Sequence, residues 1–474
     1  MDIWIKTLLL QSGICVVSII LGVAVLRLSL ASAILAAVLV TPVPLFKVSA
    51  GTAGFIYAAD LLAIVLLLRR LFGGAVEEAR ATLLIRLSFL MLVLLPALST
   101  LLGYAVNPQE RGLNFVFLNL ARGFAYFVVF SAFVGRANRE VHPDSILVVQ
   151  CVAFWLVACC GLVHYLAGVD LDLWNRQLGV EQGILSGGFG GGFMGLYRGA
   201  VGAWGMAIVG ITPVVFAQRR FGGIVTPAIV VTVMGSIMAV GSRQGAVIGG
   251  LSLIIGYVMA VRSRPAGMRV GAFLRGMGSI GLLGILVVAG WGAFSPYSFQ
   301  RFVVRRFDFL LDPALAVEMA KARTSATPFA VENVTGNAQT FLVGVGYGLE
   351  GGSSGLGSGL RMVMIDSEIL MTWQEGGILL LMVYAAFLVM LRFRWQHRNW
   401  PADAHERTVV GAAVVALYGG IALLYGHFFI MNVHASEAPI AYWNWALFGI
   451  AVGLTSKHTQ QPQVEVPQPI SHVF

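Results

Sequence analysis

MIDSEILMTWQEGGILLLMVYAAFLVML, residues 364–391, is the stretch that decides the fold. Its charged residues, Asp366, Glu368 and Glu375, all lie in the first half, and the remainder is an apolar run. A helix needs about 20 mostly apolar residues to cross the hydrocarbon of a bilayer. Within hydrocarbon every backbone amide has to be satisfied by the protein, which a helix does within one segment. The stretch therefore predicts a helix that spans a membrane.

The same pattern recurs along the whole chain. Of its 474 residues 58% are hydrophobic and 11% are charged, and the mean hydropathy is +0.84, so the protein has lipid rather than water as its solvent. We predict an all-α polytopic membrane protein with 12–13 transmembrane helices in one transmembrane domain, residues 1–456. The predicted spans are 4–26, 29–46, 53–68, 83–104, 113–134, 145–168, 199–217, 223–241, 244–261, 270–294, 364–391, 408–431 and 438–456.

Positive charge in short loops marks the cytoplasmic side of a membrane protein. Alternate connections carry arginines, which are Arg69, Arg70, Arg80, Arg136, Arg139, Arg219, Arg220, Arg262, Arg264, Arg269, Arg392, Arg394, Arg398 and Arg407. We assign these connections to the cytoplasm, together with a disordered tail over residues 457–474. The long segments 169–198 and 295–363 then lie outside, so the extracytoplasmic face carries most of the structure beyond the membrane.

The residue pattern argues against several kinds of site. The four cysteines lie inside apolar runs without a CxxC or Cys/His spacing, so we predict no metal and no cofactor. The net charge of +9 comes from arginines scattered in loops rather than clustered with aromatic residues, so we predict no nucleic-acid partner. The glycine-rich stretches 186–195 and 344–359 lack the context of a phosphate-binding loop, and we interpret them as mobile extracytoplasmic loops.

Asp60 and Arg122 are charged residues inside predicted spans, where an ionisable group is costly unless it is paired or faces water. Asp60 is seven residues into one span and Arg122 is nine residues into another. With about 1.5 Å of rise per residue, both reach a depth of roughly 10–14 Å from the outer surface. They could form an intramembrane ion pair that holds two helices together, or they could bind substrate.

Arg198 and Arg243 each lie at the outer end of a predicted span. Arginine at a helix end commonly extends toward the interface without any further role. Two guanidinium groups on one face can also clamp phosphate oxygens, because they stay charged and bind in a bidentate way. The pair therefore indicates a diphosphate ligand, with the interfacial interpretation left open.

Asp366 and Glu368 precede the apolar run of residues 364–391 and face the outer surface. A carboxylate at this place could act as general base on an acceptor hydroxyl. Asp or Ser followed by Glu before an apolar run is also a signature of a helix N-terminus. A capping role is thus the alternative for both residues.

Taken together, these motifs resemble the O-antigen ligase and Wzy-type polysaccharide polymerase superfamily. The similarity lies in Arg198-Gly199, Ser242-Arg243-Gln244-Gly245, the glycines from Gly344 to Gly348, and Asp366-Ser367 nine residues before Glu375-Gly376-Gly377. Ligases of this superfamily have a His-Asn dyad where this chain has Asp366-Ser367, so the resemblance is closer to the polymerases. Arg323 resembles a further arginine that these proteins carry near the substrate.

The resemblance implies a metal-independent glycosyltransferase with a GT-C-like fold in the bacterial inner membrane, active at the extracytoplasmic face. It implies an undecaprenyl-diphosphate-linked oligosaccharide repeat unit as substrate, in exopolysaccharide or O-antigen biosynthesis. Arg198, Arg243 and Arg323 would bind the diphosphate, and Asp366 or Glu368 would be the catalytic base. Membrane lipid, a chain-length regulator and a flippase of the same pathway would be partners.

Two other functions are left open. An O-antigen ligase or a protein O-oligosaccharyltransferase would share the fold and would need another base, for which His427 and His434 are candidates. A lipid-linked glycan flippase or a transporter would share the span count and the buried charges. Transporters often contain inverted repeats with interrupted spans. The sequence shows no such repeat, and the long loop 295–363 suits an active site better.

Overall fold

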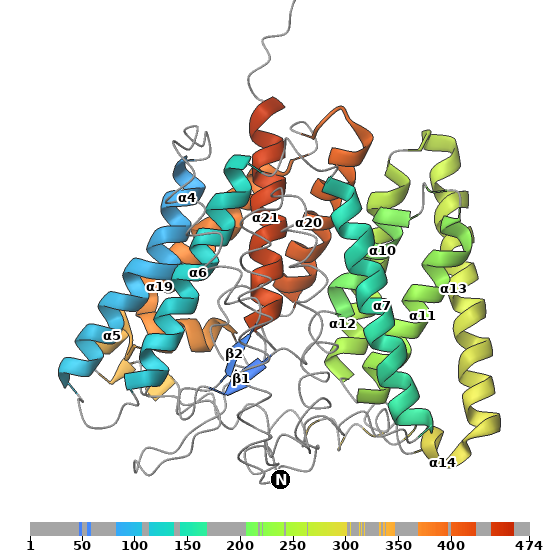
Figure 1. Cartoon of the computed structure of the whole chain (residues 1–474), viewed down its shortest axis with the longest axis horizontal. Coiled ribbons are helices and arrows are strands. Elements are labelled where there is room, and N and C mark those ends of the chain that lie inside the picture. The colour runs from blue at the N-terminus through green and yellow to red at the C-terminus, as the bar shows by residue number, and fades with distance from the viewer. Residues whose placement is uncertain are drawn as a thin grey trace, which may run out of the picture.

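The protein is a bundle of helices in the computed structural model (Figure 1). The model describes residues 47–49, 55–57, 82–106, 113–136, 143–167, 205–216, 219, 221–240, 243–262, 264–300, 304, 312, 314, 317, 331–332, 335–336, 338–346, 368–396, 400–422 and 438–458. The helices are α4 (Thr82–Phe89), the π-helix η2 (Leu90–Leu94), α5 (Leu95–Val106), α6 (Leu113–Arg136), α7 (Pro143–Ala167), α10 (Gly205–Phe216), α11 (Gly222–Val240), α12 (Arg243–Arg262), α13 (Ala266–Phe294), α14 (Pro296–Phe299), α18 (Ala338–Val343), α19 (Glu368–Arg394), α20 (Ala404–Ala422) and α21 (Ala438–His458).

Most of these helices coincide with predicted spans to within a few residues. The segments α4, η2 and α5 follow one another without a gap and fill the predicted span 83–104. The last helix, α21, continues through His458, so the predicted tail begins two residues later than expected. Apolar length alone locates these helices, because a segment in hydrocarbon has to satisfy its own backbone.

A short β-hairpin is the exception to the helical pattern. Strands β1 (Lys47–Ser49) and β2 (Phe55–Tyr57) pair antiparallel, with Val48 opposite Ile56. The predicted span 53–68 is therefore not helical at its start. The physical reason is that β-branched and aromatic residues such as Val48, Ile56 and Tyr57 favour a strand once a partner strand is present.

The protein is a helical membrane protein. Within the described residues, four helical segments are long and apolar enough to cross a bilayer: Leu83–Gly103, Gly245–Arg262, Ala266–Phe294 and Thr372–Arg394. Helix α13 has a surface that is largely apolar and exposed. Ile280 is its one buried apolar residue in the described part of the chain. Leu282, Ile285 and Leu286 are 62%, 68% and 61% exposed. Such a helix is stable where lipid rather than water contacts its surface.

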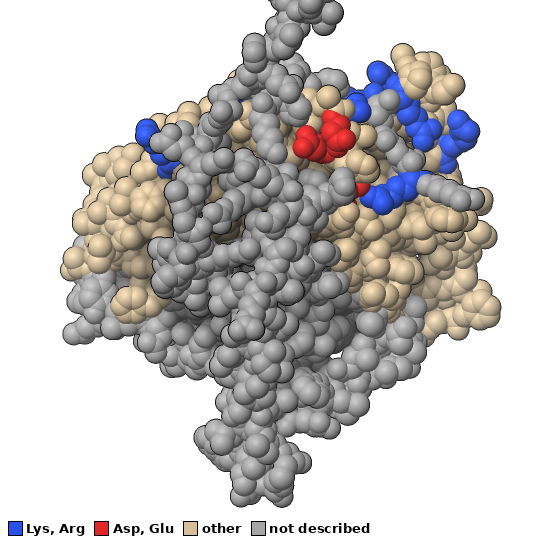
Figure 2. Space-filling view, turned by 45° about the horizontal axis from the view of Figure 1, so that its top comes forward, with Lys and Arg blue, Asp and Glu red and all other residues tan. Residues whose placement is uncertain are grey.

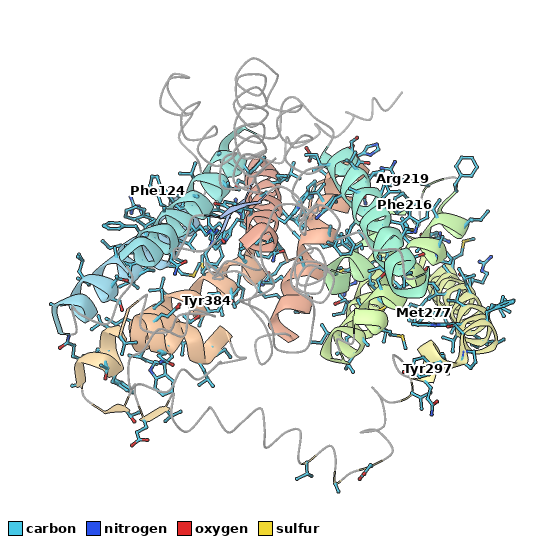
Figure 3. The ribbon with its side chains drawn as sticks, turned by 60° about the horizontal axis from the view of Figure 1, so that its bottom comes forward. Phe124, Phe216, Arg219, Met277, Tyr297 and Tyr384 are labelled. Atoms are coloured by element: carbon cyan, nitrogen blue, oxygen red, sulfur yellow. The ribbon has the colours of Figure 1, made fainter. Side chains whose placement is uncertain are left out.

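The arginine-bearing connections meet at one end of the bundle, which we call the arginine end. Helices α6, α12, α19 and α21 finish there, and α7, α11, α13 and α20 begin there (Figure 1). Figure 2 shows Lys and Arg side chains along this edge of the surface. Figure 3 labels Arg219, which follows α10 at the arginine end, and Tyr297 of α14 at the opposite end. The arginines of these connections that the structure describes thus lie at one end of the bundle, and the side of the membrane that this end faces stays a prediction.

Arginines at this end also tie helices together. Arg219 donates a hydrogen bond of 2.7 Å to the Asp144 carboxylate at the start of α7. Arg394, the last residue of α19, donates to the Ser456 hydroxyl in α21. Arg269 of α13 donates to backbone carbonyls of the preceding turn, at 2.9 and 3.1 Å. The contacts of Arg219 and Arg394 join segments far apart in the chain, whereas those of Arg269 stabilise a local turn.

Changing pH is expected to alter the stability of this end through His405. Its Nδ1 lies 2.8 Å from Oδ2 of Asp144. That hydrogen bond raises the pKa of His405 above its ordinary value of 6.5. The stabilisation is complete below pH 6.5 and is lost as the pH rises through the higher folded-state pKa. Because the His405 side chain is 56% exposed, we expect an effect below about 1 kcal/mol.

Thermal unfolding in detergent at about pH 5.5 and about pH 8.5 measures this effect, since those values bracket histidine titration. Wild-type protein should lose more stability toward alkaline pH than the His405→Gln variant does. Equal pH dependence of the two proteins would mean that the contact contributes nothing.

Close backbone packing holds α10, α12 and α20 together on the other side of the bundle. A Cβ atom added at Gly256 of α12 would lie 1.9 Å from the carbonyl oxygen of Gly210 in α10. A Cβ atom at Gly210 would in turn lie 2.5 Å from the carbonyl oxygen of Ser252. Small residues at such crossings let helix backbones approach in a membrane, where dispersion contacts replace the hydrophobic effect as the main attraction.

Candidate functional site

Helix α19 is interrupted at Gly377. The residue has φ 67° and ψ −172°, far from helical values. At the break the carbonyl oxygen of Gln374 accepts a 2.7 Å hydrogen bond from the Val345 N–H, and that of Glu375 accepts a 2.9 Å bond from the Gly346 N–H. Carbonyls that would otherwise bond within the helix are therefore satisfied by another segment, as buried backbone groups require.

This second segment, which we call the glycine strap, consists of Gly344, Val345 and Gly346. Gly344 and Gly346 have φ of 71° and 77°, which side chains other than glycine rarely adopt. A Cβ atom on Gly346 would lie 2.5 Å from Cα of Thr100 in α5. The strap thus lies in backbone contact with both α5 and α19. The sequence predicted a mobile loop from 344 onward, whereas these first residues are held by hydrogen bonds.

A hydroxyl group from α5 completes the junction. Ser99 donates a hydrogen bond to the carbonyl oxygen of Glu375, which also accepts the bond from the strap. Both residues are buried, at 1% and 6% exposure. Three segments far apart in the sequence therefore meet at one peptide group of a broken helix.

The Ser99→Ala variant is expected to lose about 1 kcal/mol of stability, because one buried hydrogen bond to the junction disappears. Ser88→Ala is the matched control, since Ser88 is also fully buried and its hydroxyl donates to Ile85 in its own helix. Thermal unfolding of both variants in detergent measures the difference. A control that loses as much stability as Ser99→Ala would contradict a special role for the junction.

Two polar residues of α6 lie at the same level as the break. The rings of Phe130 in α6 and Phe387 in α19 are 5.7 Å apart, and both helices run toward the arginine end. Asn119 precedes Phe130 by eleven residues and Gly377 precedes Phe387 by ten. At 1.5 Å per residue these steps are about 16 Å and about 15 Å. Asn119 and the break therefore lie at about the same depth, with Arg122 one turn further along α6.

These buried polar groups lie at about the same depth of an apolar bundle, and we call them the polar belt. The belt contains Ser99, Thr100, Asn119, Arg122, Gln374 and Glu375, each at most 6% exposed. Next to it Tyr126 stacks edge-on against Tyr442 of α21, with ring centroids 4.6 Å apart. Polar groups at this depth are costly unless they bond to each other or to a ligand, so such clusters mark functional sites in membrane proteins.

The residues predicted from sequence fall into three groups. Arg122 is in the belt at 2% exposure, while its predicted partner Asp60 lies outside the described residues. Arg243 begins α12 and Glu368 begins α19, both at the end opposite the arginine end. The remaining candidates lie outside the described residues: Arg198, Arg323, Asp366, His427 and His434.

Asn119 and Ser99 were missed by sequence reasoning. A signal for Asn119 was present, since an amide three residues before Arg122 lies on the same face of an apolar helix. Ser99 carried no such signal, because a lone serine in an apolar helix usually bonds to its own backbone. Within the described residues no cluster of three or more His, Cys, Asp or Glu side chains could hold a metal ion.

Comparison with known proteins adds no relative. No protein-family model matches this sequence, and neither does any curated protein. The fold and site define a helical membrane protein whose interrupted helix meets a buried polar belt.

Proposed function

We propose that the protein is a polymerase that joins undecaprenyl-diphosphate-linked oligosaccharide repeat units at the extracytoplasmic face of the bacterial inner membrane. The observation that supports this most is the polar belt at the α19 break, which is buried in an apolar bundle. The belt lies toward the bundle end opposite the arginine end. With the arginines in the cytoplasm, that end faces outside, where lipid-linked repeat units are joined.

The proposed reaction needs few protein groups. A hydroxyl of the acceptor glycan attacks the anomeric carbon of the donor, the bond from that carbon to the diphosphate oxygen breaks, and undecaprenyl diphosphate leaves. The hydroxyl proton passes to a carboxylate, for which Asp366 or Glu368 is proposed. Negative charge that develops on the leaving group is stabilised by fixed cations, for which Arg198, Arg243 and Arg323 are proposed. The bundle would contain 12–13 spans with a GT-C-like arrangement.

Reconstitution tests the proposal. Purified protein in liposomes is incubated with a lipid-linked repeat unit, and products are separated by length. Chain extension with release of undecaprenyl diphosphate is the expected result. Transfer of a finished glycan to lipid A core or to a protein would make the protein a ligase or a protein O-oligosaccharyltransferase instead.

A second candidate function is favoured by one observation. Interrupted helices line the substrate path of many secondary transporters, and α19 is interrupted. A flippase for lipid-linked glycans would move the repeat unit between leaflets without forming a glycosidic bond. Such movement without bond formation in the liposomes would replace the polymerase proposal.

Replacing Arg243 by alanine is expected to reduce polymer formation by at least about 100-fold, the loss typical of one preorganised contact to transition-state charge. The matched control is Arg262→Ala, because Arg262 ends the same helix, α12, at the arginine end. The control should retain most of its turnover. Initial rates of both variants with one lipid-linked repeat unit measure the effect. Full activity of the Arg243→Ala protein would exclude the residue from donor binding.

A further inference from the structure

Asn119 has no hydrogen-bond partner for its side chain among the described residues. The residue is 0% exposed, and both Nδ2 and Oδ1 lack a partner. A carboxamide can donate two hydrogen bonds and accept two. Leaving such groups unpaired inside a protein costs about 1–3 kcal/mol each. A buried amide of this kind needs an explanation, and at Asn119 a ligand can supply it because a second polar group, Arg122, lies beside it on the same helix.

The position of Asn119 is held firmly. A Cβ atom on Gly123, one turn along α6, would lie 2.3 Å from the carbonyl oxygen of Leu92 in η2. Helix α6 also packs along α21, where the Tyr126 ring meets Tyr442. Helix α6 is therefore packed closely against η2 and α21 in the two turns that follow Asn119, which limits how far this residue can move.

Arg122 determines what kind of ligand this place can take. It lies three residues after Asn119 on the same helix face and is 2% exposed. A guanidinium group binds anionic oxygens, whereas a carboxamide binds a hydroxyl by donating and accepting at once. The two side chains therefore suit a ligand that carries hydroxyls next to a negative charge. The sugar that is attached to the diphosphate of a lipid-linked glycan has this chemistry.

We infer that Asn119 binds the first sugar of the lipid-linked donor through its hydroxyl groups. The inference rests on the proposed function and adds a residue that determines which donor is accepted. The amide, which has no partner among the residues that the structure describes, forms its hydrogen bonds when the donor enters the belt. Asn119 is therefore a binding residue whose removal affects donor affinity and leaves the fold intact.

Gln150 of α7 provides the matched control. It too is 0% exposed, and its Nε2 and Oε1 likewise lack partners among the described residues. It lies six residues after Asp144, in the half of α7 next to the arginine end, and away from the α19 break. Replacing each amide by leucine removes a buried unpaired group of similar size.

The experiment measures thermal unfolding of wild-type, Asn119→Leu and Gln150→Leu proteins in detergent, alone and with two probes. One probe is the lipid-linked repeat unit of the turnover assay, and the other is undecaprenyl diphosphate without sugar. Both variants should be as stable as wild type or more stable without ligand, because an apolar isostere removes an unsatisfied amide. Asn119→Leu should bind the repeat unit about 10-fold to 100-fold more weakly and bind undecaprenyl diphosphate as wild type does. Gln150→Leu should bind both probes normally.

Four outcomes would overturn the inference. An Asn119→Leu protein that is less stable than wild type and binds the repeat unit normally would give Asn119 a structural hydrogen bond instead. Equal loss of binding to both probes would place the contact on the lipid diphosphate rather than on the sugar. A wild-type protein that neither polymerises nor binds the repeat unit would remove the proposed function together with the inference. If the wild-type protein polymerises and the Asn119→Leu variant binds the repeat unit with normal affinity, the inference is wrong and the proposed function stands.

Discussion

The Gly377→Ala variant is expected to lose more than about 3 kcal/mol of stability, since strained backbone and a steric clash add at one residue. Gly377 has φ 67°, and a Cβ atom there would lie 2.3 Å from the carbonyl oxygen of Leu342 and 2.5 Å from the N atom of Val343. Both contacts are with backbone atoms at the end of α18, so no side chain can rotate away. Relief requires α18 and the glycine strap to move off α19.

Under the proposed polymerase function the variant should also lose polymer formation, because Gln374 and Glu375 of the polar belt directly precede the break. Thermal unfolding and the yield of monodisperse protein in detergent measure the first effect, and reconstituted turnover measures the second. Gly284→Ala is the control, since a Cβ atom on this α13 glycine meets nothing within 4 Å. Alanine there should be neutral or slightly stabilising, because it favours a helix over glycine by up to about 1 kcal/mol. A Gly377→Ala protein as stable as this control would mean that the break is not rigid.

The Gly256→Ala variant is expected to lose stability at the upper end of the roughly 1–3 kcal/mol that overpacking costs. The added methyl group would lie 1.9 Å from the Gly210 carbonyl oxygen and 3.1 Å from the Gly210 Cα atom. The clashing atoms belong to the backbone of Gly210, which has no side chain that could rotate away. Helices α10 and α12 therefore have to separate. Gly210 is also packed closely against α20, because a Cβ atom on Gly210 would lie 2.6 Å from a methyl carbon of Val415.

Gly250→Ala on the same helix is the control for this prediction. A Cβ atom on Gly250 meets nothing within 4 Å, so alanine should increase stability slightly there. Thermal unfolding in detergent compares the two proteins. If both variants unfold at the same temperature, the crossing of α10 and α12 is looser than the structure indicates.

The candidate site was predicted only in part. Arg122 was found because a charge in an apolar run is conspicuous, and the motifs Gly344 to Gly346 and Glu375 to Gly377 were recognised as sequence features. That these two motifs bond to each other was not predicted, and neither was the contribution of Ser99, 276 residues away from Glu375. Hydrogen bonds between such distant segments leave no periodic trace in a sequence.

The positions of the membrane helices were determined by the sequence alone. Residues 364–391 predicted a spanning helix, and α19 occupies Glu368–Arg394. The same holds for α6, α12 and α21, because in lipid the length of an apolar run decides where a helix forms. Only the tertiary structure decided that α19 breaks at Gly377, since the carbonyls freed there need the strap N–H groups and the Ser99 hydroxyl as partners. A helix can be interrupted in an apolar bundle only where another segment supplies those hydrogen bonds, and that depends on which segments become neighbours on folding.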